Sequence, residues 1–232
     1  MAGPGRRLTT DQMTNLVIRQ SAPAVSQRNR ILDAAERLLG RFGYRKMTVD
    51  DIAAEAGIGK GTVYLSFPSK EEVVLSTVDR IVERVCAAMR EEAAGDASAP
   101  DRLRAMLRAR VLVRFEAVAA YSASLNDLLG SIRAALLARR VQHFEQEIAI
   151  LARVIAGAQQ DGELTAGTPR RIVRALVLAT NSFLPYALSP EELGDAKRLR
   201  REAGDVIDIV IDGITASNPA SNPPRTARRK RP

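Results

Sequence analysis

The stretch AGIGKGTVYLSFPSKEE, residues 56–72, decides the fold, because it gathers three glycines, a lysine, a threonine and a tyrosine around one turn. A loop that cradles a nucleotide phosphate would follow the pattern G-x-x-x-x-G-K-[ST]. Here Ala54 stands where the first glycine belongs, and Gly61 stands where the hydroxyl belongs. The preceding residues also have the spacing of an amphipathic helix, whereas a phosphate loop follows a buried strand. The stretch is therefore not predicted to bind a nucleotide.

Composition narrows the class of protein. The chain has 232 residues, 46% of them hydrophobic and 27% charged, so it is long enough to bury a core as one or two domains. No apolar run approaches the roughly 18 residues of a membrane span, and we expect a cytoplasmic protein without a membrane partner. The single cysteine, Cys86, excludes an internal disulfide, and with the single histidine, His143, it cannot form a zinc cage. We expect no metal and no other cofactor.

The net charge of +8 is distributed unevenly. Residues 1–75 contain 11 Lys and Arg against 8 Asp and Glu, residues 76–216 contain 19 against 19, and residues 217–232 contain 5 against none. A basic N-terminal part and a basic tail favour a polyanionic partner, although a solvated arm and tail would have the same composition.

The residues before the quoted stretch predict two helices. From Gln27, apolar residues recur at the spacing of one helix face, and Gly43 is typical of the end of such a helix. The apolar face consists of Ile31, Ala35, Leu38, Leu39 and Phe42. Thr48 and Asp51 have the spacing of a capping box that begins a second helix, which Gly57 ends after about two turns.

Two further helices follow the glycine turn. The residues Lys60 to Phe67 predict a short third helix with Val63 and Phe67 on its inner side. Ser69 and Glu72 form an S-x-x-E capping box, which predicts the start of a long fourth helix that extends to about Ala93. Two short helices joined by a tight glycine turn are typical of a helix-turn-helix, whose second helix lies in the DNA major groove.

The helix-turn-helix hypothesis assigns a role to each polar residue of the motif. Lys60 and Thr62 stand at the N-terminal end of the third helix, where side chains meet base edges, and Gly61 allows close approach of the backbone. Tyr64 would give its hydroxyl to a phosphate. Thr48 and Lys70 each lie at a helix N-terminus, which favours a phosphate. The alternative interpretation is an ordinary surface turn between capped helices.

The same residues resemble a known family. Residues 28–74 combine a Phe-Gly pair at the end of the first helix with Thr-x-x-x-Ile-Ala-x-x-Ala-Gly and Gly-x-x-Tyr-x-x-Phe-x-x-Lys. This combination resembles the DNA-binding domain of the TetR (tetracycline-repressor-like) family of bacterial transcriptional regulators. The resemblance implies an all-helical homodimer whose C-terminal domain senses a ligand. It also implies DNA contacts at the positions of Thr48, Lys60, Gly61, Thr62, Tyr64 and Lys70.

The resemblance further implies a mechanism. A repressor of this kind binds a palindromic double-stranded DNA operator as a dimer and is released by a small, lipophilic effector. Leu65 and Ser66 depart from the family pattern, because an aromatic residue and a histidine or tyrosine are frequent at these positions.

The remainder of the chain predicts helices and no strands. Apolar residues keep a helical period from Leu103 to Phe115, a break is possible at 122–124, and residues 131–160 predict one long helix. Two more helices are expected at 169–188 and 190–216. We therefore expect an all-α protein in which an N-terminal helix-turn-helix three-helix domain is joined by a long helix to a C-terminal helical ligand-sensing and dimerisation bundle. Its divisions are a flexible basic arm (1–26), a helix-turn-helix domain (27–75), an effector-binding and dimerisation domain (76–216) and a disordered basic tail (217–232).

The last two helices carry more apolar residues than one protomer is expected to bury, which favours dimerisation through them over an internal hairpin. An effector pocket is expected between helices of the bundle. Its candidate lining residues are Phe115, Tyr121, Phe144, Phe183 and Tyr186, with Asn126, His143 and Asn181 as possible polar groups.

Two other functional classes were considered. The sequence lacks the nucleophile and base signature of an enzyme, so we expect no catalysis. A helical protein–protein interaction module without sequence-specific DNA binding remains the alternative, although such a module would need no capped glycine turn.

Overall fold

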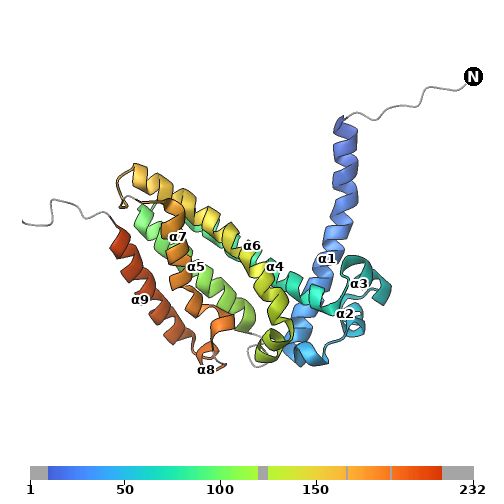
Figure 1. The fold of residues 1–232 in the computed structure, drawn as a ribbon. Helices are drawn as coiled ribbons and strands as arrows, with labels where there is room; N and C mark the ends of the chain where they lie inside the picture. Colours follow the sequence, from blue (N-terminus) through green and yellow to red (C-terminus); the bar gives the residue numbers. More distant parts are fainter. Residues whose placement is uncertain (1–9, 120–124, 166, 189, 216–232) are drawn as a thin grey trace, which may run out of the picture. The chain divides into compact units, whose positions relative to one another are not determined.

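The computed structural model describes residues 10–119, 125–165, 167–188 and 190–215, with side chains described from Ser26 onward except at 190 and 191 (Figure 1). The elements are α1 (Thr10–Lys46), α2 (Val49–Ala56), α3 (Lys60–Ser66), α4 (Lys70–Ala93), α5 (Ala99–Val118), α6 (Leu125–Gln160), α7 (Pro169–Ala179), η2 (Asn181–Phe183), η3 (Pro185–Ala187), α8 (Pro190–Leu193) and α9 (Ala196–Ile214). Within these residues the chain is all-α, as predicted, and the only β-type pairing is an isolated bridge between Leu164 and Thr215.

The chain divides into two compact units. The first unit comprises residues 1–81 and 118–139, and the second comprises residues 82–117 and 140–232. Both α4 and α6 contribute to each unit. The first unit includes the start of α6, which the sequence analysis grouped with the later helices. Ion pairs link this segment to the rest of the first unit. Arg139 contacts Glu72 and Asp79 on α4, and Arg45 contacts Asp127.

Helix α1 starts at Thr10, within the segment 1–26 that was predicted as an arm in which a short helix is possible between Thr10 and Gln20. Extending an existing helix costs much less than nucleating one, so a helix anchored by its packed C-terminal half can grow towards its N-terminus. Residues 1–9 lie outside the described part. The helix kinks at Gly43, which has φ 72° and ψ 171°, as the glycine stop predicted.

One residue predicted for the buried face of α1 is exposed. Ile31, Ala35, Leu38 and Leu39 are buried, but the Phe42 side chain is 52% exposed. The kink follows directly after Phe42, so no further turn of α1 continues its face. Met47, beyond the kink, is fully buried and occupies the core at this end.

The predicted capping and turn of α2 are confirmed. Thr48 and Asp51 form a reciprocal capping box, in which the Asp51 N–H donates to Thr48 Oγ1 at 3.1 Å and the Thr48 N–H donates to Asp51 Oδ2 at 2.9 Å. Gly57 ends the helix in the left-handed conformation with φ 65°. The Ile58 N–H reaches back to the Ala53 carbonyl at 3.0 Å, which completes a Schellman motif.

The capping box predicted for α4 is present in one direction. The Glu72 N–H donates to Ser69 Oγ at 3.1 Å, as expected. The Glu72 carboxylate, however, accepts hydrogen bonds at 2.6 Å from Arg139 on α6. A guanidinium offers a carboxylate a charged bidentate partner, which competes well with a backbone N–H.

The second unit has one apolar core built from α4, α5, α6, α7 and α9. Its fully buried residues include Leu103, Met106, Leu151, Ile155, Val173 and Ile211. Helix α6 begins at Leu125, before the predicted start at Ser131, while the predicted break at 122–124 lies outside the described residues.

Both of the last two predicted helices are interrupted. The segment predicted as one helix over 169–188 leaves the α conformation after Ala179 and continues as two 3-10 turns. Pro185 lacks the N–H that an α-helix would need there. The segment predicted over 190–216 divides into α8 and α9, because the Asp195 side chain accepts the Arg198 N–H at 2.9 Å and starts a new helix.

Candidate nucleic-acid interface and ligand site

Helix α3 presents one side to solvent and anchors the other in the core. Val63 and the following Phe67 are each 1% exposed, whereas Tyr64 is 49% and Leu65 is 89% exposed. Lys60 and Gly61 are exposed too, and Thr62 is partly exposed. Seven residues of helix span roughly 10 Å, which fits a major groove roughly 12 Å wide. The part of the chain predicted to read DNA is therefore available on the surface of its own unit.

Lys60 is held at the start of α3 by a carboxylate of the preceding helix. Its ammonium donates to Asp50 Oδ2 at 2.8 Å. The hydrogen bond and the charge of Asp50 raise the pKa of Lys60. Asp50 takes one of the three N–H donors of this ammonium, so two remain for an acceptor on DNA.

Two arginines of α1 form hydrogen bonds to the helices of the helix-turn-helix. Arg28 donates to the Ser66 carbonyl at 3.1 Å and to Ser76 Oγ at 3.0 Å, and its guanidinium lies 4.1 Å from the centre of the Phe67 ring. Arg30 donates to the Ala56 carbonyl at 2.6 Å. Cations favour helix C-termini, and these contacts cover the ends of α3 and α2. Sequence reasoning missed both residues, since a long-range pairing of this kind leaves no local pattern.

Lys70 also has a supporting role. Its ammonium donates to the Tyr44 and Met47 carbonyls, both at 3.0 Å, and lies 4.2 Å from the centre of the Tyr44 ring. An ammonium has three N–H donors, so one remains for a phosphate. The Thr48 hydroxyl similarly donates to Asp51 Oδ2 at 2.7 Å, and the hydrogen bonds from Thr48 lower the pKa of Asp51.

Four of the five predicted ligand residues lie in the described part of the chain. Phe115 is buried, and Tyr121 lies outside the described residues. Phe144 and Tyr186 lie on Arg140, whose guanidinium is 5.4 Å from the centre of each ring. The Tyr186 hydroxyl is buried without a hydrogen-bond partner among the described residues, which leaves a donor for a ligand.

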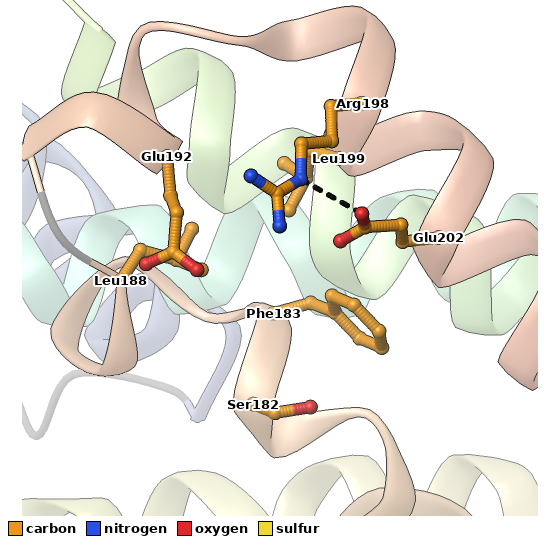
Figure 2. Close-up of a pocket in the computed structure, with 7 residues that line it drawn as sticks. All are labelled: Ser182, Phe183, Leu188, Glu192, Arg198, Leu199 and Glu202. Carbon is orange, nitrogen blue, oxygen red and sulfur yellow. Dashed lines mark hydrogen bonds and ion pairs between the residues drawn. The ribbon is translucent and has the colours of Figure 1, made fainter.

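Phe183 lines a cavity together with residues of η2, α8 and α9 (Figure 2). The cavity has a volume of ≈130 Å³, and the ion pair between Arg198 and Glu202, at 2.7 Å, lies at its edge. Pockets that hold drug-sized ligands measure about 300–1,000 Å³. This cavity would therefore have to enlarge before such a ligand could enter.

A buried charged cluster crosses the second unit, and sequence reasoning missed it. Arg110 is fully buried and donates to Glu147 Oε2 at 2.6 Å, to Thr180 Oγ1 at 2.7 Å and to Asn181 Oδ1 at 2.7 Å. Arg114 pairs with the other oxygen of Glu147. Burial lowers the pKa of Arg110, and Glu147 opposes this shift. Arg110 and Arg114 continue the helical stripe of Leu103 and Leu107, and this pattern was the available signal.

The described residues contain neither a cluster of metal ligands nor a helix that could span a membrane. No three His, Cys, Asp or Glu side chains gather there as a metal site, and His143 is buried with contacts of its own. No described helix is both long and apolar enough to cross a membrane.

Comparisons with known proteins identify a family for the segment that contains the helix-turn-helix. Residues 31–84 match the family described as bacterial regulatory proteins, tetR family. Over 54 residues the chain is 46% identical to the HTH-type transcriptional regulator EthR of Mycolicibacterium smegmatis, a match that covers 23% of this chain and only 25% of EthR.

Proteins that match most of the chain have a lower sequence identity to it. The chain is 24% identical over 202 residues to the fatty acid metabolism regulator protein of Bacillus subtilis, which covers 85% of this chain and 98% of that protein. A solved structure, a transcriptional regulator of the TetR/AcrR family from Thermobifida fusca, has the same fold with a TM-score of 0.60 at 23% identity, over 81% of this chain and 98% of that one. These comparisons identify residues 31–84 as a domain of the tetR family of bacterial regulatory proteins.

Proposed function

We propose that the protein is a DNA-binding transcriptional regulator that reads its operator with α3. The observation that carries the proposal is the outward face of α3, which is exposed at Lys60, Gly61 and Tyr64 while Val63 fixes the helix to the core. Relatives of the matched domain are transcriptional regulators, which supports this assignment.

The proposed contacts follow from the geometry of the motif. Lys60 and Thr62 reach base edges, the Tyr64 hydroxyl donates to a phosphate, and the small Gly61 lets the backbone approach the groove. Thr48 and Lys70 each stand at a helix N-terminus, where free N–H groups favour a phosphate. Phosphate contacts position the protein, and base contacts give the sequence preference.

The proposed regulator binds a palindromic operator as a homodimer through α7 and α9. Leu178 on α7 is 59% exposed and Ile209 on α9 is 71% exposed, although Val173 and Ile207 are buried within the protomer. These two helices therefore contribute to the internal core and still leave apolar side chains for a second copy. Two-fold symmetry matches half-sites about 34–36 Å apart or a multiple of this distance.

The proposed regulation is repression that a small lipophilic effector relieves, in the cytoplasm where the operator lies. A relative whose match spans most of both chains is a fatty acid metabolism regulator, which supports a lipophilic effector. Helix α4 belongs to both units, so a change in the second unit can reach the first along one helix. An effector shifts the equilibrium by no more than its difference in affinity for the two states.

The test begins with selection of operator sequences from a random DNA pool by the full chain, followed by binding titrations at several salt concentrations. The logarithm of affinity should fall linearly with the logarithm of salt concentration. Lys60→Ala should alter the preference among operator variants, because a base contact is lost, whereas Tyr64→Phe should weaken binding to all of them similarly. Arg201→Ala, which removes an exposed charge from the second unit, serves as the control.

Each outcome has a clear meaning. A response that does not change with salt, or no enriched sequence, would contradict DNA binding and favour an interaction module. A Lys60→Ala variant that keeps the operator preference of the unchanged protein would contradict direct base reading by this residue.

A further inference from the structure

The second unit contains a groove with an unusual charge. It has a volume of ≈360 Å³ and is formed by the last turns of α4, the start of α5 and the last third of α6. Three arginines line it, Arg90, Arg102 and Arg153, against the single carboxylate of Asp161. The lining therefore carries a net charge of +2. The volume falls within the range of small-molecule sites, about 300–1,000 Å³.

Most other arginines in the described part of this unit neutralise a carboxylate. Arg104 and Arg108 contact Asp208, and Arg170 contacts Glu145. Arg90 and Arg153 have no such ion pair among the residues that the structure describes, although the groove includes Asp161. Three arginines that line one groove repel each other, and Asp161 offsets only part of their charge, so an anion bound among them would lower this repulsion.

Arg102 adds a second observation that points to a ligand. Its Nη1 donates to the Ala93 carbonyl at 3.0 Å, which fixes the guanidinium at the end of α4. Its Nε is buried and has no hydrogen-bond partner within the described part of the chain. A buried N–H without an acceptor costs about 1–3 kcal/mol, so Arg102, which lines the groove, carries an unfilled donor.

The floor of the groove is apolar. Ile150 is 7% and Ala158 is 2% exposed, and both line the cavity. An anion with an apolar or aromatic body would cover this floor while its charge meets the arginines. Guanidinium groups bind phosphate and carboxylate through paired N–H donors. A net charge of +2 matches the dianion of a phosphate monoester better than a carboxylate with a single charge.

We propose that this groove binds a small organic phosphate, a phosphate monoester on an apolar or aromatic body, with Arg90, Arg102 and Arg153 holding the phosphate. Binding at this site does not depend on DNA recognition by α3. An effect of the phosphate ester on DNA affinity, transmitted through α4, would rest on the proposed function.

The experiment measures binding to the full chain without DNA by isothermal titration calorimetry in 150 mM salt, using phenyl phosphate, inorganic phosphate and benzoate as probes. Phenyl phosphate should bind more tightly than either of the others. Arg90→Ala and Arg153→Ala should each weaken its binding about tenfold, because each removes a charged hydrogen-bond partner. Both side chains are exposed, so the variants should fold, and Arg201→Ala is the control of equal charge change.

Three results would overturn the proposal. Phenyl phosphate that binds Arg153→Ala as tightly as Arg201→Ala would show that the groove is not the site. Equal affinity for inorganic phosphate would contradict an organic ligand, and equal affinity for benzoate would contradict recognition of the second charge. Because no DNA is present, each result is independent of whether α3 recognises an operator.

Discussion

Gly57 and Gly61 are close neighbours in the motif, but they differ in backbone conformation. Gly57 has φ 65°, a conformation that L-residues rarely adopt, and it turns the chain between α2 and α3. Gly61 lies within α3, and a Cβ added there would meet nothing within 4 Å. The backbone conformation therefore requires glycine at position 57, whereas nothing within 4 Å in the protein requires it at position 61.

Substitution of the two glycines should separate folding from DNA binding. Gly57→Ala should destabilise the first unit by about 1–2 kcal/mol, the cost of a left-handed L-residue. Gly61→Ala should leave stability unchanged or raise it by up to about 1 kcal/mol, because alanine loses less backbone entropy in a helix. The same variant should bind the operator more weakly. Thermal unfolding and DNA titration of both variants measure this, and unchanged DNA affinity of Gly61→Ala would contradict close backbone approach.

The buried carboxylate of Glu147 should be critical for the second unit. Glu147→Gln would leave Arg110 and Arg114 buried together without a counter-charge, at a cost of about 3–5 kcal/mol. Cys86 is the only cysteine, is 2% exposed and has a pKa raised by burial, so its reaction with a thiol reagent reports unfolding of this unit. The urea midpoint for labelling should fall strongly.

A nearby carboxylate supplies the control for this variant. Glu145 lies on the same helix and pairs with Arg170, but both side chains are exposed at 53% and 67%. Glu145→Gln should therefore change stability by less than about 1 kcal/mol. Equal labelling midpoints for the two variants would contradict a structural role of the buried cluster.

At the scale of the element, α2 and α3 are too short to be stable by themselves. Isolated helices shorter than about 12–15 residues are marginal in water, and these have eight and seven residues. Their ends are therefore satisfied by specific groups: Thr48 and Asp51 begin α2, Gly57 ends it, and Arg28 and Arg30 cover the final carbonyls. The orientation of α3 depends on these end contacts together with Val63.

Loss of the α2 cap should affect stability and DNA binding together. Thr48→Ala removes the hydroxyl that accepts the Asp51 N–H, which should cost about 1 kcal/mol. It also removes a proposed phosphate contact, so operator affinity should fall at every salt concentration. Thr48→Ser keeps the hydroxyl and should behave like the unchanged protein in both urea unfolding and DNA titration. A Thr48→Ala variant with full operator affinity would exclude a role for this hydroxyl in phosphate binding.

At the scale of the whole molecule, the exposed apolar residues of the second unit are unevenly placed. Leu178 and Ile209 lie on α7 and α9, which pack against each other, whereas Val141 lies on α6 and is 66% exposed. On α9 the exposed Ile209 lies between the buried Ile207 and Ile211, so this helix has an inner and an outer apolar side.

Charge on the outer side should therefore disrupt the proposed dimer. Ile209→Glu should give the mass of a monomer in light scattering and should weaken binding to a full palindrome about a hundredfold or more, since the second half-site is no longer tethered. Val141→Glu places the same charge on α6 and should remain a dimer. If Ile209→Glu has the same mass and operator affinity as Val141→Glu, α9 is not the dimer interface.

The sequence by itself was sufficient to predict the helix-turn-helix. The Thr48 cap, the glycine turn and the inward Val63 were predicted because each depends on residues a few positions apart, where capping and helical period act. The all-helical class followed for the same reason. The exposure of Phe42 was not foreseen, because the helical period does not show where the covering helices stop.

Only the tertiary structure decided what depends on residues far apart in the chain. The buried cluster joins Arg110, Glu147 and Thr180 from three segments, and it holds Thr180 at the point where the predicted long helix ends. Arg139 similarly draws Glu72 away from a local cap. Charged side chains are normally solvated, and burial becomes favourable only when distant partners meet. A sequence records the charges, but their pairing is set by the packing of the helices that carry them.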